Sequence, residues 1–171
     1  MNNDRHSQNQ LYQKLAPSMM GVCMRYCKSR EEAEESLQEG FIQVFNAIKQ
    51  CRGEGAFEGW VRKIMVNTAL QRLRSQSYLK AVTSHSENLP EAADKEYILP
   101  ALSAKELLVV IQKLSPMYRA VFNLYVFEGL KHREIAQLLN ISEGTSKSNL
   151  SDARAILQRE VLKMQNLAQV K

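Results

Sequence analysis

The sequence has few of the residues that interrupt helices or build a covalent framework. Its 171 residues include seven glycines, four prolines and three cysteines. No alternating run typical of a strand stands out, so we expect an all-α protein. No apolar run approaches the length of a membrane span, and the polar residues 1–10 do not resemble a signal peptide. We therefore expect a cytoplasmic protein without membrane insertion.

The cysteines are too few and too irregular to form a disulfide scaffold. Cys23 and Cys27 lie four residues apart on a predicted helix, so they could share a metal with Cys51 or with a histidine. The alternative that we favour is burial as small hydrophobic residues. The histidines fall in separate segments: His6, His85 and His132. We therefore expect neither a metal nor another cofactor.

Catalytic patterns are also missing from the sequence. We find no nucleophile with a placed base, no glycine-rich phosphate loop and no cluster of metal ligands, so we do not expect an enzyme. The net charge of +5 and the pI of about 9.2 are compatible with a nucleic-acid partner.

The N-terminal part reads as helical. Apolar residues recur at helical spacing through residues 8–28, and Pro17 predicts a break at which a new helix starts. Ser29 is expected to cap the next helix. Away from the apolar stripe of that helix lie Glu35, Gln38 and Glu39. This acidic, amide-rich face could dock on a basic partner, and a simple solvated face is the alternative.

The following predicted helix, from Phe57 to about Arg74, carries basic charge. No acidic residue occurs in residues 61–80. Four polar residues share one face of this helix: Lys63, Asn67, Gln71 and Arg74. Cations interleaved with amides suit phosphate contacts, and Trp60 at the start of the stripe suits base stacking. Packing in the core is the alternative for Trp60.

Residues 76–106 differ in composition from both flanks. Serine, threonine and proline appear, and acids outnumber bases. This predicts a flexible, weakly acidic linker. The linker divides the chain into two predicted small helical domains, residues 8–75 and residues 107–165.

Residues 129–154 predict a helix-turn-helix. The first helix has an apolar face, Asn140 tolerates the left-handed backbone of a sharp turn, and Ser142 is a suitable cap for the second helix. The preceding helix is expected to bury Tyr125. Six residues of the second helix are expected to point largely outward: Thr145, Lys147, Ser148, Ser151, Asp152 and Arg154. Such a face suits the DNA major groove, and an ordinary helical hairpin is the alternative.

These motifs resemble two regions of the bacterial sigma-70 family. The residues that resemble region 4 are Leu114–Arg119, Gly129, Glu134–Ala136 and the stretch from Gly144–Thr145 to Ala153–Arg154. Region 2 is resembled by Glu35–Phe41, Phe57, Trp60, Asn67–Ala69 and Arg74. The two regions occur in the family's order and are joined directly, as in the extracytoplasmic-function (ECF) subgroup. The resemblance covers most of residues 10–160.

The resemblance implies an RNA polymerase sigma factor that directs core polymerase to specific promoters. In the family, region 2 binds the clamp helices of the polymerase β′ subunit and opens the downstream promoter element. Region 4 binds the β flap and reads the upstream element. The residues implied to bind core polymerase are Glu35, Gln38 and Glu39. Those implied at the downstream element are Trp60, Lys63, Asn67, Gln71 and Arg74. Those implied at the upstream element are Lys147, Ser148, Ser151, Asp152 and Arg154.

Three positions depart from the family pattern. Lys131 replaces a capping Ser or Thr, and Asp152 replaces a frequent Arg. Ser146 replaces an apolar residue, which predicts looser packing at this position. An anti-sigma factor is a further partner that the resemblance allows. The alternative functions are a stand-alone helix-turn-helix transcriptional regulator and an interaction adaptor without a DNA role.

Overall fold

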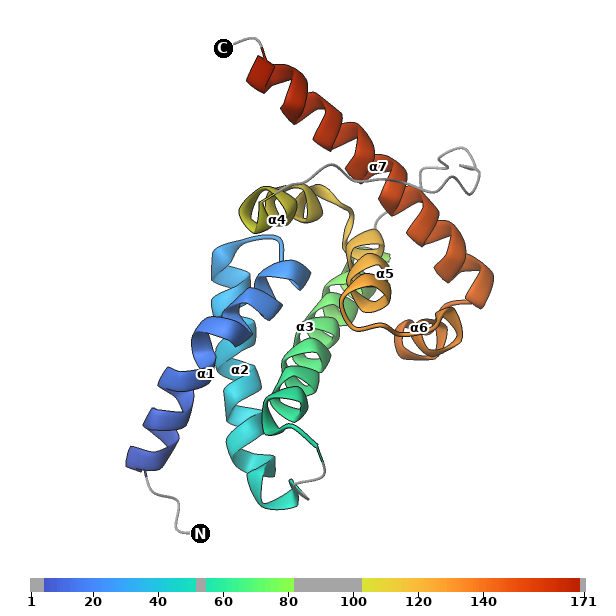
Figure 1. Cartoon of the computed structure of the whole chain (residues 1–171). Coiled ribbons are helices and arrows are strands. Elements are labelled where there is room, and N and C mark those ends of the chain that lie inside the picture. The colour runs from blue at the N-terminus through green and yellow to red at the C-terminus, as the bar shows by residue number, and fades with distance from the viewer. Residues whose placement is uncertain (1–4, 52–54, 82–102, 170–171) are drawn as a thin grey trace. The chain divides into compact units, whose positions relative to one another are not determined.

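The computed structural model describes residues 5–51, 55–81 and 103–169, with side chains for residues 5–51, 55–74 and 103–166. In these ranges the ordered elements are all helices, as Figure 1 shows, and the predicted all-α fold is confirmed. The helices fall into two compact units, one within Met1–Ser84 and the other within His85–Lys171. Each unit buries its own apolar residues.

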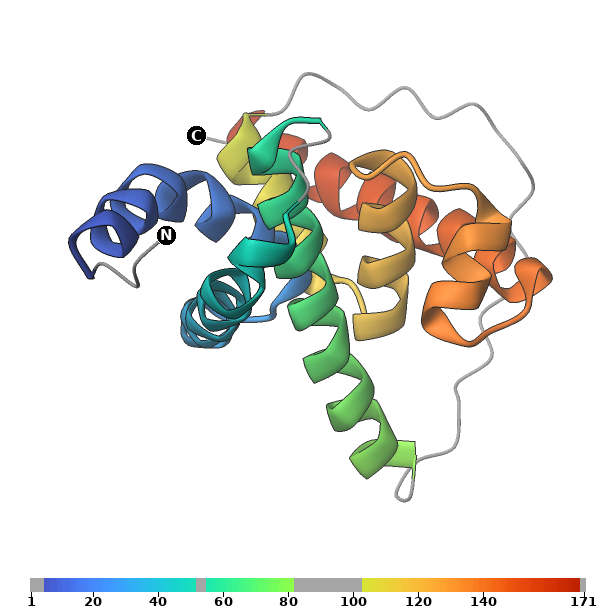
Figure 2. The ribbon, with the colours of Figure 1, turned by 90° about the horizontal axis from the view of Figure 1, so that it is seen from below.

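The first unit is built from three long helices. They are α1 (Arg5–Tyr26), α2 (Arg30–Ala47) and α3 (Phe57–Ala81), with a short 3-10 helix, η1 (Ile48–Gln50), after α2. Each of the three packs against the other two, and Figures 1 and 2 show them side by side. Their buried side chains include Met19, Val22, Phe41, Val44, Val61, Met65 and Leu70.

The expected break at Pro17 is wrong. Helix α1 continues through this residue. A proline inside a helix removes one N–H donor, so the carbonyl of Gln13 loses its usual helical partner. Gln13 and Pro17 are both exposed, and water can satisfy that carbonyl. At the residue after the proline, the hydroxyl of Ser18 donates to the Leu15 carbonyl at 3.0 Å.

Helices α2 and α3 approach each other closely at Gly40. This glycine is buried, and a Cβ atom placed on it would overlap Met65 Sδ and lie 3.1 Å from Met65 Cε. Ser29 caps α2 as predicted, because its hydroxyl accepts from the Glu32 amide at 3.3 Å. Both features fix the position of the α2 face that carries Glu35 and Glu39.

The second unit consists of α4 (Ala104–Lys113), α5 (Pro116–Val126), α6 (His132–Leu139) and α7 (Glu143–Gln169). Helices α4, α5 and α6 all pack on α7. The core side chains include Ile111, Val121, Leu124, Ile135, Leu150, Leu157 and Val161. Helices α6 and α7 form the predicted helix-turn-helix.

Local signals set the turn between α6 and α7. Asn140 has a left-handed backbone, with φ of 55°. The Ser142 hydroxyl accepts from the Thr145 amide at 2.9 Å and thereby caps α7. Both predictions are confirmed. The predicted burial of Tyr125 is wrong, because 37% of this residue is exposed.

Two helices enter the segment predicted as a linker. Helix α3 extends to Ala81, beyond its expected end near Arg74, and α4 begins at Ala104. Residues 82–102, the middle of the predicted segment 76–106, lie outside the described residues. The flexible linker and the exact domain limits therefore stay predictions.

Candidate nucleic-acid interface

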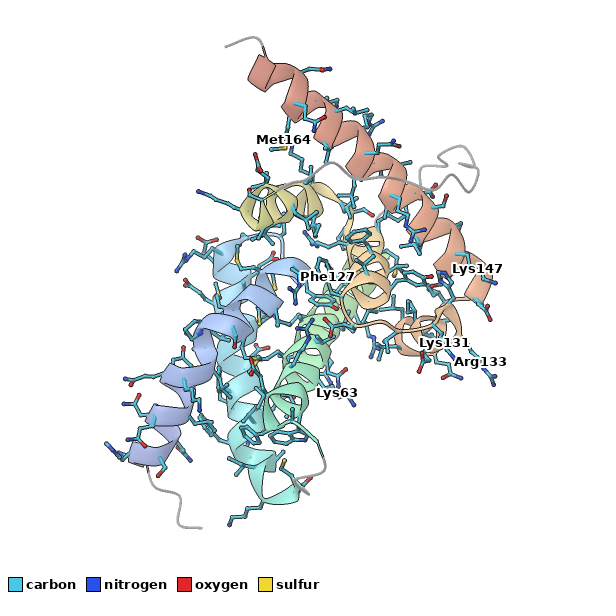
Figure 3. All side chains as sticks on the ribbon, in the orientation of Figure 1. Lys63, Phe127, Lys131, Arg133, Lys147 and Met164 are labelled. Carbon is cyan, nitrogen blue, oxygen red and sulfur yellow. The ribbon has the colours of Figure 1, made fainter. Side chains whose placement is uncertain are left out.

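A polar stripe runs along the exposed side of α3. Lys63, Asn67, Gln71 and Arg74 are all exposed. The opposite side of the helix buries Val61, Met65 and Leu73, which fixes the orientation of the stripe. Figure 3 shows Lys63 on this helix. The structure thus brings the four predicted residues together on one face that can present cations and amides to a phosphate backbone and to base edges.

Trp60 lies at the N-terminal end of this stripe. It is half-buried, and its ring centroid is 5.6 Å from that of Phe57. An indole held by a neighbouring ring keeps part of its surface available for stacking while losing little freedom. Both of its expected uses, core packing and base stacking, therefore have some support in its position.

The predicted acidic face of α2 is exposed but already paired within the unit. Arg72 of α3 donates from Nη1 to Glu39 Oε1 at 2.7 Å and from Nη2 to Glu35 Oε2. Burial alone would lower the pKa of Arg72, but the two carboxylates outweigh it and raise the pKa. Gln38 is exposed between the two acids. A basic partner that binds this face must therefore exchange with Arg72 or bind beside it.

The first turns of α7 carry two of the predicted DNA contacts on an open surface. Lys147 and Ser148 are exposed, and Lys147 Nζ lies 2.9 Å from Glu143 Oε1 one turn earlier. The Ser148 hydroxyl donates to the Thr145 carbonyl at 3.1 Å. Ser151 follows on the same side and is half-buried. The Lys147–Glu143 pair lies at the surface, where such pairs contribute little and exchange readily with phosphate.

Asp152 and Arg154 are directed instead toward α5. The Tyr118 hydroxyl donates to Asp152 Oδ2 at 3.3 Å. Burial, followed by the charge of Asp152, raises the pKa of Tyr118. The guanidinium of Arg154 lies 5.6 Å from the centroid of the Tyr125 ring, within cation–π range. The structure therefore separates these two half-buried residues from the exposed set of Lys147 and Ser148.

Sequence reasoning missed two cations beside the start of α7. Lys131 and Arg133 are exposed at the start of α6, and Figure 3 shows them with Lys147 at the same end of the second unit. The signal was the uninterrupted run Lys131-His132-Arg133 immediately before the first helix of the motif. We name Lys131, Arg133 and Lys147 the basic end of the second unit.

Lys131 also occupies the N-cap position of α6, where its side chain offers no acceptor. The Glu134 carboxylate nevertheless accepts from the Lys131 backbone amide at 2.7 Å, which keeps one half of a capping box. The Glu134 amide donates to the Lys131 carbonyl at 2.9 Å. A missing N-cap side chain typically costs about 1 kcal/mol of helix stability, and the contact from Glu134 partly offsets this cost.

A cluster of metal ligands is absent from the ranges that carry side chains. No three His, Cys, Asp or Glu residues there are grouped so that they could hold a metal ion. Burial and the nearby Cys27 raise the pKa of Cys23 to about 12. No described helix combines the length and the hydropathy that crossing a membrane requires.

Comparison with known proteins finds a family match for each of the two units. Residues 11–78 match the family model for sigma-70 region 2, and residues 104–157 match the model for sigma-70, region 4. The ECF RNA polymerase sigma factor SigW of Bacillus subtilis is 30% identical over 151 residues, covering 82% of this chain and 81% of SigW. The RNA polymerase sigma-H factor of Pseudomonas aeruginosa is 25% identical, covering 91% of this chain and 86% of the relative.

A solved structure has a similar fold. It is the sigma factor RpoE in complex with the anti-sigma factor NepR from Bartonella quintana, with a TM-score of 0.54 and 19% identity over 91% of this chain and 96% of that one. Together with the family matches, these relatives show that the chain belongs to the sigma-70 family, as an ECF-type RNA polymerase sigma factor. A stand-alone helix-turn-helix regulator is not favoured, because the first unit matches region 2.

Proposed function

We propose that the chain binds core RNA polymerase and promoter DNA, with separate surfaces for each. The observation that carries this proposal is the exposed stripe on α3, which presents Lys63, Asn67, Gln71 and Arg74 within the unit that matches region 2. The chain supplies recognition and strand capture, and it contributes no catalytic chemistry of its own. It acts in the cytoplasm, where core polymerase is found in bacteria.

The α2 face is the proposed contact to polymerase. Glu35, Gln38 and Glu39 would meet the clamp helices of the β′ subunit, and the second unit would bind the β flap. A partner that binds beside Arg72 meets two carboxylates that Arg72 already holds in one orientation. Such preorganisation lowers the entropy that two exposed side chains lose when a partner binds them.

The α3 stripe is the proposed contact to the opened downstream element. Cations hold phosphates without regard to sequence, whereas an amide can read a base edge. Asn67 lies between Lys63 and Gln71 on this stripe and is the amide best placed for such a role. Trp60 would stack on an unpaired base at the end of the stripe.

The start of the second unit's α7 is the proposed reader of the upstream element. Lys147, Ser148 and Ser151 would approach the major groove, with Lys131 and Arg133 on the flanking phosphates. Asp152 and Arg154 were expected in this set, and their contacts to α5 support a role in holding α7 as well. An anti-sigma factor is a further proposed partner, as in the RpoE complex of similar fold.

Asn67→Ala tests the proposal. We expect a smaller fraction of open promoter, scored by permanganate reactivity of unpaired thymines, with core polymerase binding unchanged. Lys63→Ala is the matched comparison on the same stripe. It should weaken binding to all DNA sequences and reduce the salt dependence by about one phosphate contact. Equal loss of polymerase binding and promoter opening in Asn67→Ala would show that Asn67 is structural.

A further inference from the structure

A polar contact joins the two helices of the helix-turn-helix at their N-terminal ends. His132 is the first residue of α6, and Ser146 lies in the first turns of α7. His132 Nδ1 and Ser146 Oγ are 3.0 Å apart. Ser146 is completely buried despite its hydroxyl group, and the looser packing expected at this position stays a prediction. The contact spans the turn and lies next to Lys147.

One face of the imidazole ring also stacks on an aromatic ring. The rings of Tyr125 and His132 are stacked, with centroids 4.8 Å apart and planes inclined by 24°. Arg154 of α7 lies over the same tyrosine ring. Because Arg154 follows Ser146 by eight residues, α7 is held at two levels roughly 12 Å apart along its axis. Three helices therefore meet in one assembly, which we name the imidazole joint: Tyr125, His132, Ser146 and Arg154.

The joint constrains direction as well as distance. An apolar contact tolerates small rotations of one helix on another, whereas a hydrogen bond weakens steeply away from its preferred angle. A buried hydroxyl that loses its partner is costly, so Ser146 favours the helix orientation that keeps His132 in reach. The resemblance to region 4 implies an apolar residue at the position of Ser146, and an apolar side chain could not make this hydrogen bond.

Burial and the nearby cations together favour the neutral form of the imidazole. Burial is the main cause that lowers the pKa of His132, and the cations Lys147 and Arg154 lower it further, against the opposing effect of Glu143. Arg133 of the same helix end also interacts with Glu143. A neutral ring can accept from the Ser146 hydroxyl or donate to it, so the bond survives in either tautomer.

We propose that His132 and Ser146 are positioning residues that set the orientation of the first turns of α7, and through it the base preference at the upstream element. The inference rests on the proposed function, because it assumes that α7 is the reading helix. Neither residue needs to touch DNA. Rotation of α7 displaces Lys147 and Ser148 relative to the base edges, and bidentate or single base contacts are sensitive to such displacement.

The test uses the full chain assembled with core polymerase. The probe is a promoter mapped from transcript start sites after overexpression, with its upstream element randomised. The variants are His132→Phe, which keeps a ring for Tyr125, Ser146→Val, and both together. His6→Phe is the matched control, because His6 is exposed on α1 in the other unit. Thermal unfolding of each variant is recorded in parallel.

We expect each single variant to bind the wild-type element about tenfold more weakly and to select a different base at one position or more. The double variant should recover thermal stability, because both partners are then apolar, and should keep the altered preference. A loss that is equal for every sequence, or a preference that recovers together with stability, would reduce the joint to a folding contact and overturn the inference. A wild-type holoenzyme without sequence preference would contradict the proposed function as well.

Discussion

Gly40→Ala is the substitution that tests the packing of the first unit most closely. Gly40 is in the interior of α2, where alanine is favoured over glycine by roughly 1 kcal/mol. The new methyl group would, however, overlap the Met65 side chain, which is completely buried in α3. Overpacking of this kind typically costs about 1–3 kcal/mol. We expect the clash to outweigh the propensity gain, with a net loss of roughly 1 kcal/mol.

Gly21→Ala is the matched control. Gly21 lies inside α1 of the same unit, is exposed, and a Cβ there would meet nothing within 4 Å. It should gain the propensity term without the clash, so the protein becomes more stable by roughly 1 kcal/mol. The difference between the two variants, about 2 kcal/mol, isolates the contact of Gly40 with Met65.

Urea unfolding followed by tryptophan fluorescence measures this difference in the full chain. The sequence has a single tryptophan, Trp60, which lies on α3, so the signal reports the first unit. The free energy of unfolding of each variant is compared with that of the wild type, using the same slope of free energy against urea concentration. If Gly40→Ala stabilises the protein as much as Gly21→Ala, then the Met65 side chain does not fill the space beside Gly40 as described.

Further predictions concern the polymerase face, a buried thiol and the imidazole joint. The double variant Glu35→Gln with Glu39→Gln should weaken co-purification with core polymerase and leave helicity intact. The control Glu34→Gln, at an exposed residue of the same helix that is paired with Arg30, should leave co-purification unchanged. Equal binding by all variants would contradict the assignment. Cys23 should resist alkylation at pH 8 until the protein unfolds, because burial raises its pKa to about 12; rapid native labelling in a mass-spectrometric time course would contradict its burial. The pKa of His132 is lowered in the folded state from its ordinary value of 6.5, so the unfolded state binds more protons near and below that pH. Thermal stability of the second unit should therefore fall as the pH drops from 6.5 toward 5, and the fall should be smaller in His132→Phe; parallel profiles for the two proteins would contradict the shift.

Signals that act within a few residues made much of the fold predictable. Ser29 and Ser142 cap the helices that they were expected to cap, since an N-cap hydroxyl needs only an amide two or three residues ahead. Asn140 takes the left-handed backbone for a similarly local reason. Pro17 misled the prediction because the cost of an interrupted helix falls when the orphaned carbonyl faces water.

Contacts between distant segments were not predictable from the sequence. Arg72 pairs with Glu35 and Glu39, which are 37 and 33 residues away in the sequence, and no local spacing predicts such pairs. The same holds for Tyr118 with Asp152, which are 34 residues apart. The outward direction of the α3 stripe was predictable, because helical periodicity alone separates it from the buried side.

The measurement that tests the central claim most directly is transcription with purified core polymerase. Transcript start sites are mapped in the cell after overexpression of the chain, and the promoters found are then transcribed in vitro with core enzyme alone and with the chain added. We expect initiation at these promoters only when the chain is present, and loss of opening with Asn67→Ala while the chain still binds core polymerase. Binding to promoter DNA without any start by core polymerase would contradict a sigma factor and favour a stand-alone regulator.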